Sequence, residues 1–565
     1  MDKNRKEKCI TASPGQKIRD TVNICIYDRY LSTGGGGERY SCKMAEILSK
    51  EPGCKVYLIT DIFADLNTVQ ERLNLDLSNV TLKLFPFLSE DYAAKITGGY
   101  DIFINATYLS SLGGYAAANI YLCYFPTAFD VDFTFIHRFL LLFFRYPAVW
   151  LYRLADRISG GYKEIEVLEG IYDIKRFMLR RGVWTCGRFS VKYKNTAGKI
   201  RVGLKNPAIT GIKSMRCLVK LYGDAGNENQ LYSRELFLLP GQKHVEEIKI
   251  KSLTGGSGSY FLTVESDTFI SQNRQNGVND TRELGVVVYN EQKTPALKKF
   301  ILKLLGFVPL FLVTYPRDLS FLKTYDRIIS ISEYSRKWME KLWKTGSEIL
   351  YPPVDIELFS CSKKKKIILS VGRFFPQHHN KKQLELALNF ISLYESHRDI
   401  MSGYRLILAG GVANIDNHLE YVNKIKEIAA GYPIEVLTNI SWEKLRGIFS
   451  EALIFWHASG MGEDQQRHPE KFEHFGITTV EAMASGAIPV VVGRGGQLEI
   501  IEDGKNGFLF ESWEKMKEVT LKICRDFNLG GNVFESISKQ AITDSERFGA
   551  ANFARRLLEI IKSHI

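Results

Sequence analysis

One stretch near the C-terminal end limits the fold more than any other part of the chain. Residues 473–486 read EHFGITTVEAMASG, and the apolar run AIPVVV follows directly. Thr478 followed three residues later by Glu481 is typical of a capping box, so we predict a helix that begins at Thr478. Gly486 suits the left-handed position that ends a helix. The free N–H groups at such a helix start, those of residues 475–479, would form an anion site.

Two carboxylates flank this helix start, Glu473 in the loop and Glu481 in the first helical turn. Alone, Glu481 is explained as a helix cap. Together with Glu473, the Phe-Gly loop and the buried strand, it resembles the E-x7-E motif of GT4-family retaining glycosyltransferases, which have the GT-B fold. The resemblance implies that Glu473 holds hydroxyls of the donor sugar and that Glu481 holds the ribose hydroxyls of the nucleotide. The diphosphate would bind backbone N–H groups at the helix start: Phe475, Gly476, Ile477 and Thr478.

A second candidate anion site lies near the N-terminus. An apolar strand at 21–27 leads into Gly34-Gly35-Gly36-Gly37, and helical periodicity follows from 38 to 48. Glycines let backbone N–H groups approach a phosphate. The run is no dinucleotide fingerprint, because Arg39 occupies the third glycine position, and no Gly-Lys-Ser/Thr closes a P-loop. It resembles the GGGGER loop of GT4 enzymes, which implies that Gly35, Gly36 and Gly37 face the donor phosphates.

Many GT4 members place a histidine ahead of a Tyr-Pro pair at a later strand end. Tyr124 takes that place here. No acceptor-side residue is therefore assigned.

Basic residues follow the first strand of the second α/β half, which ends near Val371. A guanidinium and an ammonium at a strand end can neutralise a diphosphate, although a solvated charge cluster is the ordinary alternative. In GT4 enzymes an arginine and a lysine at this place clamp the leaving diphosphate. The resemblance implies Arg373 for the arginine, and the helix start at 384–385 favours Lys382 over Lys381 for the lysine.

Strands alternate with helices on both sides of an all-β region, which predicts an α/β protein with an insert. By resemblance the α/β parts form a GT-B fold, two Rossmann-like domains facing a cleft. Short alternating runs predict an antiparallel β-sandwich for the insert, whose role stays open between oligomerisation, acceptor-glycan binding and packing. The predicted divisions are 1–160 with 293–350 for the N-terminal acceptor domain, 161–292 for the insert, 351–545 for the C-terminal nucleotide-sugar-binding domain, and 546–565 for a last helix packing back on the N-terminal domain.

Two segments, 133–154 and 295–312, are apolar and aromatic but interrupted by basic residues. They suit the membrane interface, where basic side chains meet lipid headgroups. The alternative is that they are core helices with basic side chains at their ends. No apolar run is long enough to span a bilayer, and the charged N-terminus lacks the apolar segment of a signal peptide. We therefore expect a cytoplasmic protein, peripheral at the inner face of the membrane.

The net charge of the chain and the spacing of its possible metal ligands limit which molecules it can bind. The net charge of +12 favours anionic partners such as nucleotide diphosphates or acidic lipids. Nucleic acid is not expected, because no recognition motif appears. The nine cysteines include no CxxC pair, which argues against a zinc ribbon or a disulfide framework. His457, His468 and His474 lack metal-ligand spacing, so we expect neither a metal nor a cofactor.

The combined features predict a retaining glycosyltransferase, a hexosyltransferase that moves a sugar from a UDP- or GDP-sugar to a glycan or lipid-linked acceptor in polysaccharide or glycoconjugate biosynthesis. Glu473, Arg373 and Lys382 would be its catalytic residues, with positive groups meeting the diphosphate charge in place of a metal. The alternatives are a glycan-binding protein with a silent GT-B scaffold and another GT-B activity such as a nucleotide-sugar epimerase.

Overall fold

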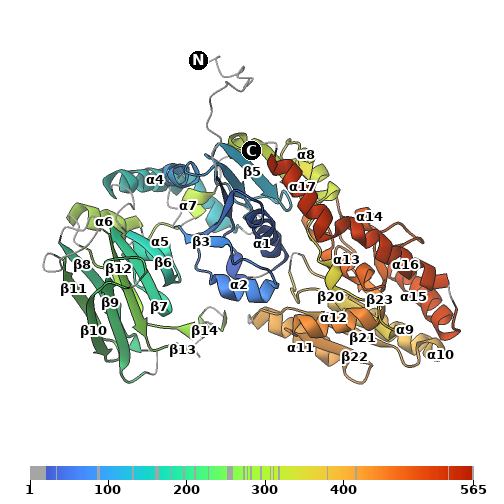
Figure 1. Cartoon of the computed structure of the whole chain (residues 1–565). Helices are drawn as coiled ribbons and strands as arrows, with labels where there is room; N and C mark the ends of the chain where they lie inside the picture. Colours follow the sequence, from blue (N-terminus) through green and yellow to red (C-terminus); the bar gives the residue numbers. More distant parts are fainter. Residues whose placement is uncertain are drawn as a thin grey trace, which may run out of the picture.

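The computed structural model contains two parallel α/β domains and an all-β insert (Figure 1). It describes residues 21–562 apart from 34, 86–89, 130–132, 160–164, 179, 195–197, 209–211, 227, 251–258, 271–273, 276–277, 280–282, 293–295, 306, 310, 316–317, 378, 414–415 and 532. The insert and the C-terminal domain lie on opposite sides of the N-terminal sheet (Figure 1). This arrangement confirms the predicted architecture of two Rossmann-like domains with an inserted β domain.

The N-terminal domain is built on a seven-stranded parallel sheet. In sheet order its strands are β19 (Glu348–Ile349), β18 (Arg327–Ser330), β5 (Ala118–Cys123), β4 (Ile102–Asn105), β1 (Val22–Tyr27), β2 (Cys54–Thr60) and β3 (Val80–Leu84). Its helices include α1 (Gly36–Ser49), α2 (Leu66–Leu73), α3 (Glu90–Thr97) and α8 (Glu333–Leu342). β4 and β5 are buried along their whole length, as expected for strands covered on both faces.

The apolar segments form α4 (Phe135–Ser159), α6 (Ala296–Leu305) and α7 (Phe311–Thr314). α4 and α6 pack together through Tyr152, Ile301 and Leu305. Within the described residues, no helix combines the length and apolar composition needed to cross a bilayer.

The insert is an antiparallel domain whose strands form one eight-stranded sheet. They are β6 (Ile165–Ile171), β7 (Val183–Lys194), β8 (Lys199–Lys205), β9 (Met215–Tyr222), β10 (Gln230–Leu238), β11 (Lys243–Lys249), β12 (Ser259–Ser266) and β17 (Val287–Asn290). Its smaller elements are α5 (Ile174–Met178), β13 (Phe269–Ile270), β14 (Arg274–Gln275), β15 (Val278–Asn279) and β16 (Glu283–Leu284). The sheet wraps around a core of its own.

The two halves of the predicted β-sandwich share one strand, because β7 pairs with strands of both. Residues 183–184 of β7 pair with β17, and residues 188–194 pair with β12. Between them Gly187 has φ +91, a value that glycine adopts without strain. The long strand therefore passes from one half to the other, and the halves stay hydrogen-bonded as one sheet.

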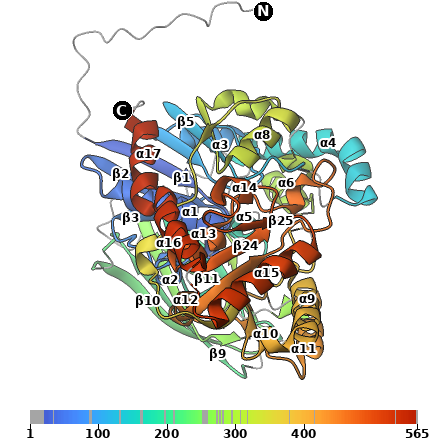
Figure 2. The same ribbon diagram turned by 90° about the vertical axis from the view of Figure 1, so that its right-hand side faces the viewer.

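The C-terminal domain has a six-stranded parallel sheet, β22 (Ile434–Thr438), β21 (Arg405–Gly410), β20 (Lys365–Val371), β23 (Ala452–His457), β24 (Ile488–Val492) and β25 (Phe508–Phe510). Its helices are α9 (Gln383–Ser396), α10 (Arg398–Met401), α11 (Asp416–Ala429), α12 (Trp442–Glu451), α13 (Ile477–Ala484), α14 (Gln497–Ile500), α15 (Trp513–Asn528), α16 (Val533–Ser545) and α17 (Ala550–Lys562). α17 runs from this domain to α1 of the first domain (Figure 2). There Phe553 packs on Tyr40 with ring centroids 5.2 Å apart.

Candidate functional site

The helix of the E-x7-E stretch begins one residue earlier than predicted. α13 starts at Ile477, and its N-cap is Gly476 with φ +122 rather than a Thr478–Glu481 capping box. Gly486 has φ +71, which confirms the left-handed position after the helix. In the part of the chain that is described, the backbone N–H groups of residues 475–478 make no hydrogen bond. The helix start is therefore open to an anion.

The side chain of Phe475 does not face this opening. It is buried and packs against Tyr351 and Phe548, with ring centroids 5.5 and 5.1 Å apart. Phe475 can contribute only its backbone to a ligand. The burial of its ring fixes the loop that presents the helix start.

Glu473 lies in the loop ahead of α13 within a group of polar side chains from three segments. Its Oε2 atom is 2.5 Å from Nζ of Lys381 and 2.8 Å from Nε2 of His457. Burial alone would raise the pKa of Glu473, but Lys381 and His457 outweigh it and hold this pKa well below its usual range. Glu473 is therefore an anion at neutral pH.

The two neighbouring lysines point to different partners. Lys381 reaches Glu473, whereas Nζ of Lys382 lies 3.1 Å from Oε1 of Glu463. The reason is local: Lys382 has φ +58 and is the N-cap residue of α9. The structure thus brings Lys381, rather than the predicted Lys382, to Glu473.

Arg373 follows β20 and is exposed. It lies near the glycine run of the other domain, because a Cβ on Gly35 would stand 3.9 Å from its Nη1 atom. The same Cβ would stand 2.8 Å from Oε2 of Glu38, which accepts a hydrogen bond from the N–H of Gly35 at 2.5 Å. The absence of a side chain at position 35 therefore leaves room for Glu38 to cap α1.

Gly36 and Gly37 lie inside the first turn of α1 rather than in a loop before it. A Cβ on Gly36 would be 3.5 Å from Cδ1 of Ile477, the first residue of α13. The N-terminal ends of α1 and α13, which come from different domains, therefore meet. Each helix start carries partial positive charge, so the two together with Arg373 favour an anion between the domains.

Tyr124 occupies the position after β5 where the resembled family often has a histidine. Its hydroxyl donates a hydrogen bond of 2.9 Å to the carbonyl of Gly37. Burial raises the pKa of Tyr124 well above its usual value, so the hydroxyl stays neutral. This tyrosine ties the start of α1 to the end of β5.

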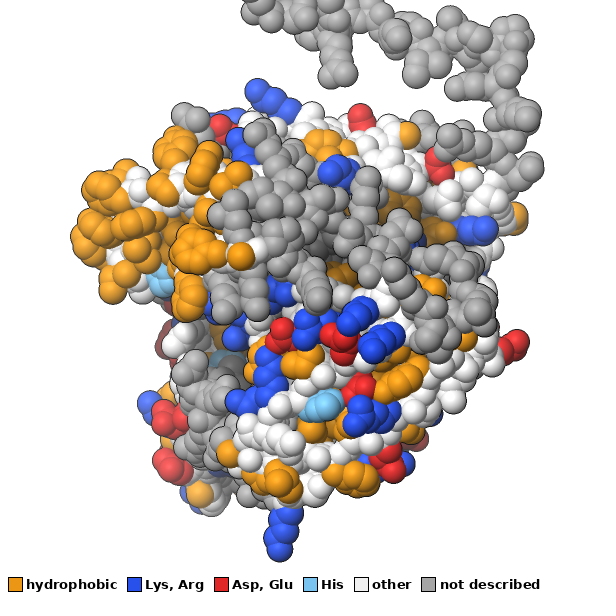
Figure 3. Space-filling model, turned by 90° about the vertical axis from the view of Figure 1, so that its left-hand side faces the viewer, with side chains coloured by type: hydrophobic (Ala, Val, Ile, Leu, Met, Phe, Trp, Pro, Cys, Tyr) orange, Lys and Arg blue, Asp and Glu red, His pale blue; other side chains and the backbone are white. Residues whose placement is uncertain are grey.

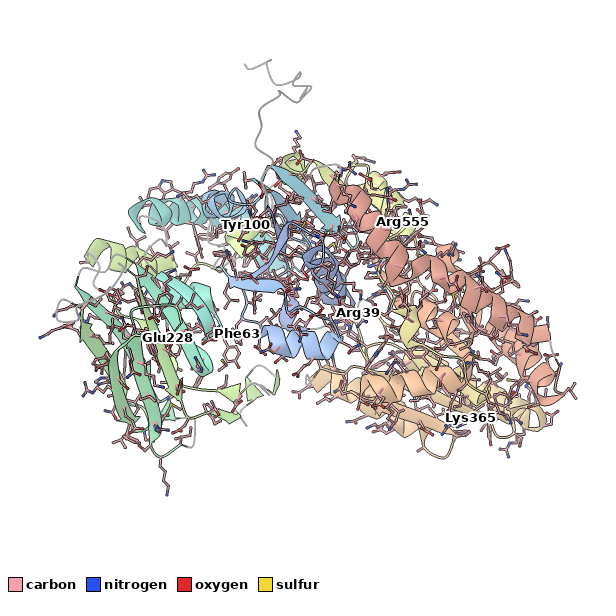
Figure 4. All side chains as sticks on the ribbon, viewed as in Figure 1. Arg39, Phe63, Tyr100, Glu228, Lys365 and Arg555 are labelled. Carbon is pink, nitrogen blue, oxygen red and sulfur yellow. The ribbon has the colours of Figure 1, made fainter. Side chains whose placement is uncertain are left out.

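Glu481 is 9% exposed and lies near Arg39 of α1 and Asp355 of the linker. Burial raises its pKa to about 8; Arg39 opposes the rise and Asp355 adds to it. Arg39 is ion-paired with Asp355, and its guanidinium stands 5.8 Å from the ring centroid of Trp442. Arg39 lies on the side of the N-terminal domain that faces the C-terminal domain (Figure 4). A buried carboxyl at this position is suited to accept hydrogen bonds from the hydroxyl groups of a ligand.

His474 joins the two domains through its ring and its carbonyl. The ring stacks on Phe125 at 4.1 Å between centroids, and the carbonyl accepts a hydrogen bond of 2.6 Å from Oγ of Ser332. Nearby, the carboxylate of Glu499 accepts the N–H groups of Glu333 and Tyr334 at the start of α8, at 2.8 and 2.7 Å. These contacts hold the loop of Glu473 against the N-terminal domain.

Among the described residues, no group of three or more His, Cys, Asp or Glu side chains is placed to hold a metal ion. His457, considered in the sequence only as a metal ligand, instead contacts Glu473. Sequence reasoning also preferred Lys382 to Lys381 and gave Arg39 no role in the site. One feature of the sequence could have identified these residues: they lie at strand or helix ends next to the predicted motifs.

Comparison with known proteins finds a family match within the C-terminal domain. The family described as "Glycosyl transferases group 1" matches residues 359–526. This match confirms for the C-terminal domain the predicted resemblance to GT4-type glycosyltransferases.

Curated relatives point the same way. A protein of Dictyostelium discoideum named GDP-Man:Man(3)GlcNAc(2)-PP-Dol alpha-1,2-mannosyltransferase is 30% identical over 225 residues, which cover 38% of this chain and 42% of the relative. The alpha-1,3/1,6-mannosyltransferase ALG2 of the same organism is 28% identical over 252 residues, covering 39% and 56%. The matches thus span about half the length of these relatives. The crystal structure of Anabaena Alr3699/HepE in complex with UDP aligns with a TM-score of 0.48 at 12% identity, covering 96% of this chain and 100% of that one.

Proposed function

We propose that this chain is a retaining glycosyltransferase that transfers a sugar from a nucleotide-sugar to a glycan or lipid-linked acceptor. One observation carries the proposal: the N-terminal ends of α1 and α13 meet beside Arg373, with Lys381 and Glu473 in the adjoining loops. This arrangement offers positive groups for a diphosphate and a carboxylate for a sugar within one site.

Each part of the donor has a proposed partner. The diphosphate binds Arg373 and the free N–H groups at the start of α13, and Gly36 and Gly37 bring the start of α1 close. Glu473 accepts hydroxyls of the sugar, and Glu481 accepts the ribose hydroxyls. The role predicted for Lys382 passes to Lys381, because Lys381 is the lysine beside Glu473.

Departure of the nucleoside diphosphate leaves negative charge on its terminal phosphate. Preorganised cations and helix starts stabilise such charge in a transition state without reorganising. Arg373, Lys381 and α13 supply these groups, so the proposed reaction proceeds without a bound metal or cofactor. Contact between the domains through His474 and Phe125 would also keep water away from the sugar.

The relatives suggest which substrates to test first. Two are named for GDP-Man or mannosyl transfer, and one name includes a dolichol-linked glycan. We therefore propose GDP-mannose as the first donor to test and a lipid-linked glycan as the acceptor.

A lipid-linked acceptor requires access to a membrane surface, and one face of the chain suits it. Phe135 and Leu142 on α4 are 83% and 73% exposed, and Phe307 after α6 is 79% exposed. Figure 3 shows hydrophobic side chains gathered on this part of the molecule. Arg145 and Arg153 lie within the same helix. We propose that this face rests on the membrane, with arginines at the headgroups.

The decisive experiment compares donor hydrolysis and transfer by wild type with Glu481→Ala, Arg373→Ala and Lys381→Ala. Each substitution is expected to lower kcat/KM at least about tenfold, the effect of losing one charge-assisted hydrogen bond. Lys382→Ala is the matched control, because its side chain pairs with Glu463 outside this group. Wild-type turnover in the three site variants would refute the assignment.

A further inference from the structure

The carboxylate of Glu473 is bound from one side only. The two nearest nitrogens approach its Oε2 atom: Nζ of Lys381, which donates a hydrogen bond of 2.5 Å, and Nε2 of His457, at 2.8 Å. In the described part of the chain, no hydrogen bond to Oε1 is found. The carboxylate therefore keeps one oxygen occupied by the protein and one available.

His457 is the last residue of β23 and its side chain is 2% exposed. Because Glu473 is an anion, its Oε2 atom can only accept, so Nε2 of His457 must carry a proton. Nδ1 lies 3.3 Å from the amide Nε2 of Gln497, which is 1% exposed. With the proton on Nε2, a neutral ring leaves Nδ1 bare, and Nδ1 can then accept a hydrogen bond from the amide of Gln497.

The surrounding groups favour this neutral ring. Burial lowers the pKa of His457; Glu473 opposes this effect and Lys381 adds to it. The other titratable groups of the cluster, His379 and His474, also have pKa values lowered by burial, that of His474 to about 4. Both rings are neutral at physiological pH and stack on each other at 4.9 Å between centroids.

We infer that His457 is a positioning residue of the proposed transferase: its neutral Nε2–H and the amine of Lys381 hold Oε2 of Glu473, so that Oε1 faces the donor sugar. Gln497 holds the ring in this tautomer. His457 does not touch the substrate. It fixes the rotation of the Glu473 carboxylate, which does touch the substrate. This inference rests on the function proposed above.

The tautomer can be measured without any substrate. In the full-length protein labelled with ¹⁵N-histidine, long-range ¹H–¹⁵N spectra between pH 5.5 and 8 are expected to show one ring with a bare Nδ1 and a protonated Nε2 throughout. Its resonances are assigned by their loss in His457→Gln. A proton on Nδ1, or a ring that becomes doubly protonated within this pH range, would overturn the inference. This readout is independent of whether the chain transfers sugar.

The kinetic test uses GDP-mannose and UDP-glucose hydrolysis. His457→Phe keeps the ring size but removes the donor, and is expected to lower kcat about 10- to 100-fold, the usual value of a hydrogen bond to a charged group. The affinity for GDP or UDP alone is expected to stay unchanged, because neither carries the sugar that Glu473 meets. Loss of a donor to Glu473 also raises its pKa, so the acid limb of the pH–rate profile moves to higher pH.

His457→Gln provides the rescue, since an amide N–H can replace the Nε2–H donor. This variant is expected to recover most of the rate and the wild-type acid limb. Equal damage in the Phe and Gln variants, or an equal loss of GDP and UDP affinity, would show a merely structural role and overturn the inference. A wild type that neither binds nor hydrolyses nucleotide-sugars would instead contradict the proposed function, while the tautomer measurement still decides the placement of the proton.

Discussion

Arg39 on α1 is ion-paired with Asp355, which lies two residues after Pro353 in the segment joining the two α/β domains. The same guanidinium donates a hydrogen bond of 2.8 Å to the carbonyl of Leu73. Its positive charge lowers the pKa of Glu481, although burial of that carboxyl dominates. One side chain of the glycine-rich helix thus links the first domain, the linker and the proposed ribose site.

Replacing Arg39 by Met should therefore weaken nucleotide binding without unfolding the chain. The pKa of Glu481 would rise further, and the carboxylate needed for the ribose would become scarcer at neutral pH. We expect GDP or UDP affinity, measured by calorimetry at pH 7, to fall about fivefold to tenfold, roughly 1 to 1.4 kcal/mol. Lys50→Met at the end of the same helix is the control, because Lys50 is half exposed and its ion pairs with described residues are those with Glu46 and Asp76. Equal affinities in both variants would contradict the proposed link.

The raised pKa of Glu481 also predicts proton release on nucleotide binding. Ribose hydroxyls donate hydrogen bonds and therefore favour the ionised carboxylate, whereas the free protein with a pKa of about 8 holds the proton at pH 7. Affinity should increase as pH rises from 6.5 to 8.5. Calorimetry in buffers of different ionisation enthalpy should detect the released proton at pH 7. A binding enthalpy independent of the buffer would contradict this assignment.

Glu481→Gln separates stability from binding at the same position. A folded-state pKa of about 8 against an ordinary value of 4.5 means that the folded chain binds more protons than the unfolded chain between these pH values. Wild-type stability should therefore fall as pH rises through this window. The Gln variant lacks this loss, so its Tm relative to wild type should increase from pH 5 to pH 8 while its nucleotide affinity decreases. A constant difference in Tm across the window would show that burial does not raise this pKa.

The E-x7-E motif and the strand pattern predicted the two α/β domains. Strands that are buried on both faces of a sheet need continuous apolar runs, and these runs can be recognised in the sequence. The helix start was missed by one residue, since Gly476 takes a positive φ that no capping pattern reports. The choice between Lys381 and Lys382 depended on the left-handed backbone of Lys382, which turns two adjacent side chains apart. The contact between His457 and Glu473 could not be predicted from the sequence. It joins the end of β23 to a loop that lies 16 residues later in the chain, and it depends on packing alone.

Tyr124 offers a test of how the glycine-rich helix is held. Tyr124→Phe removes the hydrogen bond to the carbonyl of Gly37 and should cost about 0.5 to 1.5 kcal/mol of stability. Because this bond ties α1 to β5, donor hydrolysis should also fall. Tyr404→Phe is the matched control: its hydroxyl donates to the carbonyl of Cys524 within the core of the other domain. The Tyr404→Phe variant should lose a similar amount of stability and keep its hydrolysis rate. An equal loss of activity in both variants would mean that Tyr124→Phe acts only through general destabilisation.

A buried carboxylate in the insert makes a prediction about acid stability. Glu246 on β11 is 2% exposed and interacts with three side chains: Tyr232 and Arg234 on β10 and His244 on its own strand. Burial would raise the pKa of Glu246, but these three partners outweigh it and lower the pKa below 4.5.

A lowered folded-state pKa gives stability that is present above about pH 4.5 and is lost as pH falls through the folded value. Glu246→Gln should therefore cost about 1 to 3 kcal/mol at pH 7, measured by urea unfolding, and the difference from wild type should shrink in acid. Glu265→Gln on β12 is the control, because Glu265 is more exposed and its ion pair within the described residues is a long one with Lys220, at 3.6 Å. A pH-independent difference for Glu246→Gln would contradict the role of its charge.

The exposed face of α4 predicts binding to anionic membranes. Leu142→Glu combined with Trp150→Glu places two negative charges among side chains that are 73% and 63% exposed, so the fold should tolerate them. Wild type should sediment with vesicles containing an anionic lipid and much less with neutral vesicles, because arginines of the same helix meet the headgroups. The double variant should lose most of this binding, since burial of each apolar side chain in the interface is worth about 1.5 to 3 kcal/mol. Leu529→Glu is the control: Leu529 is 86% exposed but lies at the end of α15 in the other domain. Vesicle binding that survives in the double variant, or that is lost equally in Leu529→Glu, would mean that another surface contacts the lipid.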